Sequence, residues 1–422
     1  MAERIAIIGS GIGSLSAAHF LNRSHEITVF EAAERLGGHV HTHTIEVDGR
    51  ELNVDSGFIV LNDRTYPNFH AILRELGVAV RESTMGFSVR CDRTGLEYSG
   101  ADFGGLFARR RNLISPRFWS LLKDVFAFHD DAKTALSGGD LDRTLGEFLD
   151  QHGYGKPFQE QYLIPMGAAI WSAEPERIRE FPCGTFLRFF SHHGLLSVKD
   201  RPTWQTVVGG SRTYVEALTA QFSDRIRLST PVLGVRRFDD RVEVRTAAGV
   251  ESFDQVVIGC HSDQALRMLE DPSDQERDVL SGVQFQSNSA VLHQDPRPMP
   301  KRRRAWTSWN YLVPSDPQER LAVTYGMNTL QGLETREPLL VTLNHDRFID
   351  ESKVIARMEY DHPIYTESTL RSQKRHSEIS GHRRTHYCGA YWRYGFHEDG
   401  VWSGQRVAAG LGAAEVPVGD PA

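Results

Sequence analysis

Near the start of the chain, glycines and one carboxylate stand at a spacing suited to binding a dinucleotide. Gly9 permits a tight turn, and Gly11 lets the backbone approach a pyrophosphate at the positive end of a following helix. Glu31, about 20 residues further on, can accept hydrogen bonds from a ribose hydroxyl. Ser14 occupies the third glycine site of this pattern, with Gly13 giving slack beside it. These residues predict a phosphate- and ribose-binding turn.

Two strands and a helix must position this turn. An apolar strand over 5–8 precedes it, and a helix carrying Leu15 and Leu21 follows. A second strand over 27–30 then ends at Glu31. A lone glycine turn is also compatible with an ordinary strand-to-helix connection. The two flanking strands and Glu31 favour the dinucleotide interpretation instead.

A second glycine group follows and narrows the cofactor. Arg35, Gly37 and Gly38 complete a Glu-x3-Arg-x-Gly-Gly block, whose glycine pair frees more backbone N–H groups to face phosphate. With this block the chain resembles the flavin-containing amine oxidase superfamily, which includes phytoene-desaturase-type and protoporphyrinogen-oxidase-type enzymes. The resemblance continues through the segments 55–58, 230–232, 254–259 and 389–401. It is most similar to a bacterial subgroup of predicted NAD/FAD-binding oxidoreductases with a Gly-Phe-His-Glu-Asp-Gly ending.

The resemblance implies an α/β fold. We expect a Rossmann-like FAD-binding domain of the glutathione-reductase/amine-oxidase type, interleaved with an α+β substrate domain that bears a helical cap. The expected FAD domain is discontinuous, and the substrate domain fills the gaps. The ranges are 1–70, 206–262 and 383–412 for the FAD domain, 71–205 and 263–382 for the substrate domain, and 413–422 for a flexible tail.

FAD is the cofactor that the resemblance implies. No cysteine matches the position of a covalent flavin link, so we expect non-covalent binding. The last helix should begin near Glu398, with its N–H groups toward the pyrophosphate and ribityl chain. The expected cofactor-binding residues are Gly9, Gly11, Gly13, Ser14, Glu31, Arg35, Gly37, Gly38, His39, Gly57, Phe58, Val232, Gly389, Gly395, Glu398, Asp399, Gly400 and Val401.

The chemistry implied is hydride transfer from a substrate carbon to the flavin N5, which needs no nucleophile or triad. No catalytic residue is assigned. Three residues are flavin-pocket candidates by the resemblance. His39 follows the glycine pair, and Phe396 stands where amine oxidases have an aromatic-cage tyrosine. Lys301 lies in the region where these enzymes place a lysine near N5 through a water.

His39, His41 and His43 alternate along an expected strand, which would put them on one face. A metal site is one interpretation of this pattern. No Cys or carboxylate cluster lies nearby in the sequence, so a polar strand face is favoured and no metal is expected.

Composition limits the class of protein. The formal net charge of −7 over 422 residues argues against a nucleic-acid binder. Since Glu3 and Arg4 lead straight into the first strand, we expect no signal peptide, and the sequence has no apolar run of spanning length and no metal-type spacing among four distant cysteines. These features predict a soluble, cytoplasmic protein with reduced thiols.

One stretch of the sequence combines apolar and basic residues in a way that bears on where the protein acts. Residues 106–123 interleave arginines with Phe, Trp and Leu, as in helices that lie on a membrane surface, although a core-facing helix with solvated arginines is the alternative. Peripheral contact with the inner face of the membrane is therefore one expectation.

Residues 163–171 and 186–190 resemble the lining of an apolar cavity, where Arg188 could hold an anionic head. For each of these residues, a position in the ordinary hydrophobic core is an equally compatible interpretation.

Three functions remain open. The first, which the resemblance favours, is an FAD-dependent dehydrogenase or desaturase of a fatty-acyl or lipid-like substrate. The second is a soluble flavin amine oxidase, which requires a pocket acidic enough to hold a cation. The third is a non-catalytic lipid-binding protein of the same fold. The sequence does not identify the electron acceptor, the particular substrate or the oligomeric state.

Overall fold

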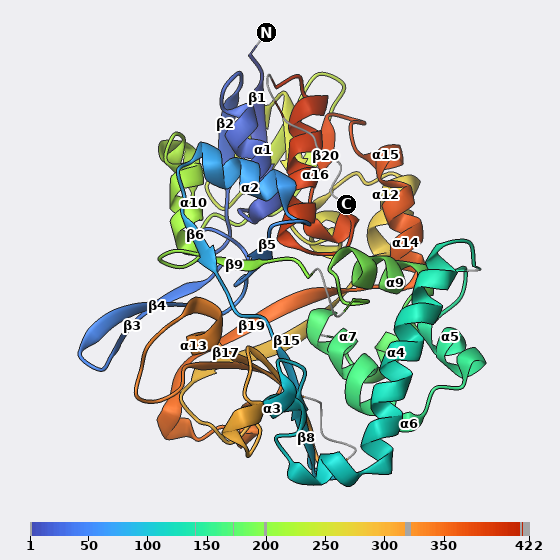
Figure 1. The fold of residues 1–422 in the computed structure, drawn as a ribbon. Helices are drawn as coiled ribbons and strands as arrows, with labels where there is room; N and C mark the ends of the chain where they lie inside the picture. Colours follow the sequence, from blue (N-terminus) through green and yellow to red (C-terminus); the bar gives the residue numbers. More distant parts are fainter. Residues whose placement is uncertain are drawn as a thin grey trace.

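The computed structural model describes residues 2–139, 141–171, 173–197, 201–316, 322–413 and 416. Its two largest sheets lie in the upper and lower parts of the view in Figure 1. Helices of the green and teal part of the chain stand beside the lower sheet. The chain passes repeatedly between the two halves, so each half combines segments that are distant in the sequence.

The upper sheet is parallel and has the order β10-β2-β1-β14-β20. Its central strand β1 pairs through Ile7 with Val29 on one side and with Val257 on the other. The strands are β1 Arg4–Ile8, β2 Glu26–Phe30, β10 Ile226–Arg227, β14 Gln255–Ile258 and β20 Thr385–Tyr387.

Both faces of this sheet are covered, which explains its nearly continuous apolar strands. Because side chains alternate along β1, Ile7 packs into a helical layer and Ile8 into the opposite core. The helical layer consists of α1 Ile12–Leu21, α2 Pro67–Glu75, α10 Arg212–Thr219 and α16 His397–Gly410. The opposite layer consists of β11 Gly234–Arg237, β12 Val242–Thr246, β13 Gly249–Phe253, α11 Ser262–Met268 and α12 Asp274–Ser281.

The lower sheet has the order β19-β15-β18-β17-β16-β7-β8 and is antiparallel except where β16 meets β7. The pair β7–β8 was not expected from the sequence. The strands are β7 Phe87–Cys91, β8 Leu96–Ser99, β15 Gln284–His293, β16 Trp309–Val313, β17 Ala322–Gly326, β18 Leu340–Leu343 and β19 Val354–Ile364.

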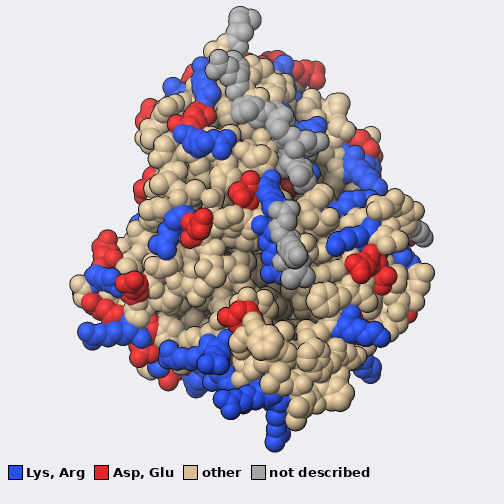
Figure 2. Space-filling model, viewed as in Figure 1, with Lys and Arg blue, Asp and Glu red and all other residues tan. Residues whose placement is uncertain are grey.

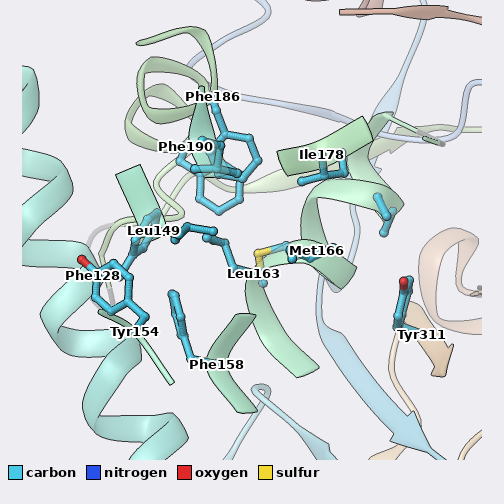
Figure 3. Close-up of a cluster of buried hydrophobic side chains, with 14 of the residues drawn as sticks. Phe128, Leu149, Tyr154, Phe158, Leu163, Met166, Ile178, Phe186, Phe190 and Tyr311 are labelled. Atoms are coloured by element: carbon cyan, nitrogen blue, oxygen red, sulfur yellow. The ribbon is translucent and has the colours of Figure 1, made fainter. Parts of the chain in front are cut away.

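The helical cap packs around a phenylalanine-rich core, shown in Figure 3, in which Phe128, Phe158, Phe186 and Phe190 are fully buried. Burying each such side chain stabilises the fold by about 1.5–3 kcal/mol. The long helix α4 begins at Pro116, where the Ser115 hydroxyl accepts a hydrogen bond from the backbone N–H of Phe118 at 3.3 Å. The cap contains α3 Phe103–Leu106, α4 Pro116–Leu136, α5 Leu145–His152, α6 Lys156–Phe158, a π-helix Gln159–Leu163, α7 Ile164–Trp171, α8 Pro175–Arg179 and α9 Cys183–His192.

Smaller elements connect the two halves. The predicted hairpin is confirmed as β3 Thr42–Val47 and β4 Arg50–Asp55, joined by Asp48 and Gly49 at φ 54° and 75°. A three-stranded sheet joins β5 Leu61–Asn62, β9 Trp204–Val207 and β6 Val80–Glu82. The remaining helices are α13 Met327–Gln331, α14 Glu367–Lys374 and α15 His376–Ile379, with 3-10 turns at Arg110–Ile114, Ser223–Arg225, Arg303–Ala305, Asp346–Phe348, Glu351–Lys353 and Ala390–Trp392.

The expected fold class, a parallel nucleotide-binding-type sheet combined with an α+β part and a helical cap, is confirmed. The exact domain boundaries stay a prediction. The predicted flexible tail, 413–422, lies almost wholly outside the described residues, and its two described residues pack against the core beneath α1. All four cysteines are free thiols. Within the described ranges, no helix combines the length and apolarity needed to cross a membrane.

Candidate active site

One cavity of about 1310 Å³ lies at the junction of the two large sheets. Its lining comes from the glycine turn after β1, from strands of the lower sheet, and from the helical cap. Single-ligand pockets usually measure about 300–1,000 Å³. This cavity therefore has room for a dinucleotide and a second molecule.

The glycine turn forms one end of the cavity. Gly9 has φ 93°, which an L side chain rarely adopts. Gly11 is the N-cap of α1, and a Cβ placed there would meet nothing within 4 Å. No side chain caps the first turn of α1, so its backbone N–H groups remain available to an anion at the cavity wall.

Glu31 lies beside this turn, at the end of β2. Its carboxylate accepts hydrogen bonds from the Ser10 N–H at 2.8 Å and the Ala33 N–H at 2.8 Å. The Thr230 N–H donates to the Glu31 carbonyl at 2.8 Å, which brings the loop carrying Val232 to the same wall. The carboxylate and the loop are thus positioned to contact a ribose and an adenine.

The second glycine pair closes over the first turn. Gly37 and Gly38 have φ 106° and 59°, and the Gly37 N–H donates to the Ser10 carbonyl at 3.1 Å. Arg35 lines the cavity while its guanidinium donates to the Val40 carbonyl at 2.7 Å. The glycine pair therefore places Arg35 and unobstructed backbone beside the glycine turn. We call this part of the cavity the phosphate end.

His39 lines the middle of the cavity and does not lie on a strand, because β3 begins only at Thr42. Its ring centroid is 5.4 Å from Tyr360 and 5.3 Å from His362. Its Nε2 is buried without a hydrogen-bond partner. Burial, with a smaller effect from His261, lowers the pKa of His39 to about 4, so the ring is neutral at physiological pH.

The segment from Asp55 to Phe58 supports the same region. Asp55 accepts hydrogen bonds from the Ser211 N–H and the Gln331 side chain, both at 3.0 Å, and burial raises its pKa to about 6. The Phe58 N–H donates to the His39 carbonyl at 3.0 Å. A Cβ on Gly57 would overlap that carbonyl, so this close approach requires glycine.

Aromatic rings form the wall between the middle and the far end. Phe396 stacks on Phe189 with centroids 4.9 Å apart. His397 stacks on Phe58 at 3.5 Å and shares a hydrogen bond of 2.9 Å with the Tyr214 hydroxyl. Burial holds the pKa of His397 well below its usual range. This wall is flat, apolar and uncharged.

The far end lies between the lower sheet and the cap. Its side chains are mainly aromatic and aliphatic, and an exposed arginine, Arg201, joins the lining. Arg188, which the sequence suggested for an anionic head, is exposed on α9 and does not line the cavity. The side chains at this end include Met85, Phe87, Tyr98, Tyr162, Met166, Ala169, Ile170, Phe189, Trp204, Trp309 and Tyr325.

Most of the predicted cofactor residues line this one cavity. They are Gly9, Gly11, Gly13, Glu31, Arg35, Gly37, Gly38, His39, Gly57, Phe58, Val232, Gly389 and Gly395, together with the flavin-pocket candidate Phe396.

The residues of the last helix were predicted at its start, and they stand there, but outside the lining. The Glu398 carboxylate accepts hydrogen bonds from the N–H groups of Asn68 and Phe69 at 3.0 and 2.9 Å. Asp399 accepts one from the Phe396 N–H at 2.9 Å, and burial raises its pKa to about 7. The structure therefore uses these carboxylates to fix neighbouring segments. Ser14, Gly400 and Val401 are buried behind the cavity wall.

The structure does not bring Lys301 to the cavity. The side chain is exposed at the surface, and its ammonium lies 3.8 Å from the Asp92 carboxylate. Position along the chain suggested a flavin neighbour, but the polar run 301–304 forms a turn outside the lower sheet. Among the described residues, no group of three or more His, Cys, Asp or Glu side chains is arranged to hold a metal ion.

Several lining residues were not anticipated, namely His261, Tyr360, His362, His397 and Arg201. His261 could have been found, because it follows the carboxyl end of the parallel strand β14, where ligands bind in such sheets. Tyr360 and His362 belong to β19 and pair with residues about seventy positions earlier, a contact that local sequence does not encode.

The residues present fit the expected FAD. Open backbone at Gly11, positive φ at Gly37, and the carboxylate of Glu31 suit its phosphates and ribose. His39, whose Nε2 has no partner among the described residues, and Phe396 line the cavity and would offer a flavin ring one polar and one apolar neighbour. These residues would hold the cofactor, and the aromatic far end would hold a substrate.

Comparison with known proteins agrees with this site. The chain matches the family described as flavin containing amine oxidoreductase over residues 15–325. It is 23% identical over 292 residues to an L-amino-acid oxidase of Notechis scutatus scutatus, covering 63% of this chain and 52% of that protein. The chain thus spans at most about half the length of the curated relatives it matches.

Solved structures show the same fold. Cyclohexylamine oxidase from Brevibacterium oxydans superposes with a TM-score of 0.70 at 14% identity, over 97% of this chain and 99% of that one. The fatty acid isomerase from P. acnes that produces CLA superposes with a TM-score of 0.67 at 15% identity, over 98% and 99%. At such low identity these matches establish architecture and not substrate.

Proposed function

The chain belongs to the flavin-containing amine oxidoreductase family, and on that premise we propose that it is an FAD-dependent dehydrogenase or desaturase of a long apolar substrate. The substrate class is a fatty-acyl or other lipid-like molecule. Bound FAD supplies hydride-accepting chemistry, which the protein directs by position and by exclusion of water. The electron acceptor that restores the cofactor is left open.

One observation carries the proposal, namely the lining of the far end of the cavity. Residues such as Met166 and Ile170 offer apolar contact surface, and Trp309 and Tyr325 add aromatic walls. The charged lining side chain at this end is the exposed Arg201. An apolar chain with an anionic head is the molecule that such a lining accommodates.

The side chains at the junction of the two ends of the cavity orient the substrate and shield it from water. Phe189 and Phe396 stack to form an apolar wall between the two ends of the cavity, which keeps water from the reacting carbon. His39 stays neutral, so its buried Nε2 can accept or donate a hydrogen bond without adding charge. We assign no general base.

Amine oxidation is the second candidate, because two carboxylates reach the same cavity. Glu359 and Asp361 line it from β19, on the side of His39 and His261. A carboxylate near the cofactor could hold a substrate ammonium group. Relatives that are named as oxidases of L-amino acids and of cyclohexylamine make this alternative concrete.

The test is anaerobic bleaching of the purified, FAD-loaded protein. Loss of the yellow colour on adding an unsaturated or methyl-branched acyl lipid, but not on adding polyamines or amino acids, is the expected result. Bleaching by amines alone would replace the proposal with amine oxidation. A protein that binds acyl lipids but no FAD would instead be the non-catalytic lipid-binding alternative.

A matched pair of variants tests the position of the anionic head. Arg201→Gln should raise the KM for a free fatty acid by about ten- to a hundredfold, as expected for a lost charge-assisted hydrogen bond of roughly 1.5–3 kcal/mol. Arg188→Gln removes an equally charged but non-lining side chain on α9 and should leave KM unchanged. Equal effects of the two substitutions would contradict the assignment.

A further inference from the structure

A second feature lies outside the active-site cavity, on the exposed surface of residues 103–123. Several apolar side chains are exposed to solvent there, among them Phe103 (75% exposed), Ile114 (83%) and Trp119 (50%). These belong to α3, to the 3-10 turn Arg110–Ile114 and to the start of α4. We call the exposed side chains of residues 103–123 the basic-apolar patch. Contiguous exposed apolar surface of this kind marks an interaction site.

The charge of the patch points to its partner. Residues 103–123 include five basic and no acidic side chains, in a chain whose net charge is −7. The second basic run, 301–304, lies against α3 through the turn Arg303–Ala305. Figure 2 shows Lys and Arg gathered at the lower edge of the molecule, around the place of α3 and β8 in Figure 1. Apolar side chains among basic ones match an anionic lipid surface.

A small cavity of about 260 Å³ opens within the patch. Three arginines, Arg109, Arg111 and Arg117, line it together with Ile114. In the part of the chain that the structure describes, Arg111 and Arg117 make no ion pair, while Arg109 donates to the carbonyls of Thr94 and Gly95. Guanidinium groups of this arrangement suit the oxygens of a phosphodiester.

The patch also adjoins the active-site cavity. Gly100 and Ala101 line that cavity, and they directly precede Asp102, whose side chain caps α3, and the exposed Phe103. An acyl chain that left a bilayer at the patch would therefore meet the rim of the cavity within a few residues.

We propose that the basic-apolar patch binds the surface of an anionic phospholipid bilayer. The small cavity takes a lipid phosphate, and the side chains of Phe103 and Ile114 enter the interface beside it. This binding does not depend on the proposed function, because it concerns the surface beside the FAD and substrate cavity and none of the cavity's own lining. It gives the protein a peripheral attachment without a spanning segment.

The test is flotation of the FAD-loaded chain of 422 residues with vesicles. Vesicles of phosphatidylcholine mixed with phosphatidylglycerol should carry the protein, and vesicles of phosphatidylcholine alone should not. Each basic residue near such a surface contributes about a fivefold factor, so the double variant Arg111→Gln, Arg117→Gln should bind roughly 25-fold more weakly. Phe103→Ser with Ile114→Ser should also weaken binding, and higher salt should release the wild type.

Control variants keep the outcome decisive. Arg236→Gln with Val250→Ser removes an exposed charge and a 55% exposed apolar side chain from the distant β11–β13 sheet, and it should bind as the wild type does. An equal loss in this control, or unchanged binding in both patch variants, would overturn the proposal. Release by inorganic phosphate at constant ionic strength would also overturn it, because the cavity would then be a site for free phosphate.

Discussion

Adding a methyl group at Gly11 should weaken cofactor binding without affecting folding. The residue has φ −67°, which any amino acid adopts, and a Cβ there points into open cavity. We predict that Gly11→Ala leaves the Tm of the apoprotein unchanged. The methyl should nevertheless crowd the pyrophosphate and raise the Kd for FAD about tenfold or more, as a steric cost of roughly 1–3 kcal/mol implies.

Fluorescence titration with FAD and a melting curve of the apoprotein would check this. Gly100→Ala is the control, because Gly100 lines the other end of the cavity and its added Cβ also meets nothing within 4 Å. This control should leave the Kd for FAD as it is. An unaltered Kd in Gly11→Ala would remove the glycine turn from the cofactor site.

The neutral histidine at the centre of the cavity gives the protein an acid sensitivity. The folded-state pKa of His39 is lowered from 6.5 to about 4 by burial and by His261. As pH falls below 6.5, the unfolded chain takes up this proton first, so the free energy of unfolding decreases until about pH 4. His39→Gln should therefore lose less Tm than the wild type between about pH 7 and pH 4.5.

Melting curves at several pH values would measure this difference. Nε2 of His39 has no partner among the described residues, and the glutamine can keep a hydrogen bond like the one that the ring makes with the backbone of Asp361. At pH 7 and above, the two proteins should show the same pH dependence. A wild-type and a variant Tm that fall in parallel below pH 6.5 would show that His39 protonates normally in the folded state.

At this scale the sequence predicted well which glycines line the cavity, because the backbone itself imposes the residue type there. Gly37 and Gly57 are needed for a positive φ or a close approach, and such needs restrict the residue type. It failed for Lys301, because order along the chain does not determine which face of a turn a side chain occupies. Glu398 was correctly placed at a helix start, but its hydrogen bonds to α2 depend on tertiary contact.

Among the elements, the crossing of α1 and α16 connects the two ends of the chain. A Cβ on Gly404 would overlap the Gly13 carbonyl and lie 3.0 Å from the Ala17 nitrogen. We predict that Gly404→Ala separates the helices, lowers stability by about 1–3 kcal/mol, and weakens FAD binding because the N-terminus of α1 shifts. Denaturant unfolding and FAD titration would measure the two effects.

Gly410→Ala supplies the comparison on the same helix. Nothing lies within 4 Å of its added Cβ, so the substitution should be neutral or stabilise the helix by up to about 1 kcal/mol. If Gly404→Ala proved as stable as Gly410→Ala, the helices would have room to adjust and the crossing would not control the cofactor site.

The strand β7 escaped prediction although one of its two partners is local in the sequence. It alternates apolar Phe87, Val89 and Cys91 with polar Ser88 and Arg90, a period-two pattern that favours a strand but runs for only five residues. It pairs on one side with β8, a few residues later in the chain, and on the other side with β16, whose residues come more than two hundred positions later. The hairpin at Asp48 and Gly49 was predicted because its signal is local.

At the scale of the whole molecule, one cavity is lined by residues of both the parallel sheet and the antiparallel sheet. The phosphate end belongs to the parallel sheet, and the far end belongs to the antiparallel sheet and the cap. A ligand that spans the junction holds both halves in place, whereas one confined to the glycine turn contacts only the upper half. This arrangement makes cofactor binding a measure of how the halves are coupled.

FAD should therefore stabilise the apoprotein more than ADP does at equal concentration. We expect ADP to occupy only the wall formed by residues 9–38 and 231–233, and FAD to contact in addition His39, Gly57 and Gly395, which line the middle of the cavity. A ligand at about 100 times its Kd adds about 2.7 kcal/mol to the free energy of unfolding. The extra contacts lower the Kd for FAD, so the rise in Tm is larger for FAD, and Gly11→Ala reduces both rises. Melting curves with each nucleotide decide the matter, because equal rises would mean that the middle of the cavity contributes nothing to binding and that no single ligand bridges the two sheets.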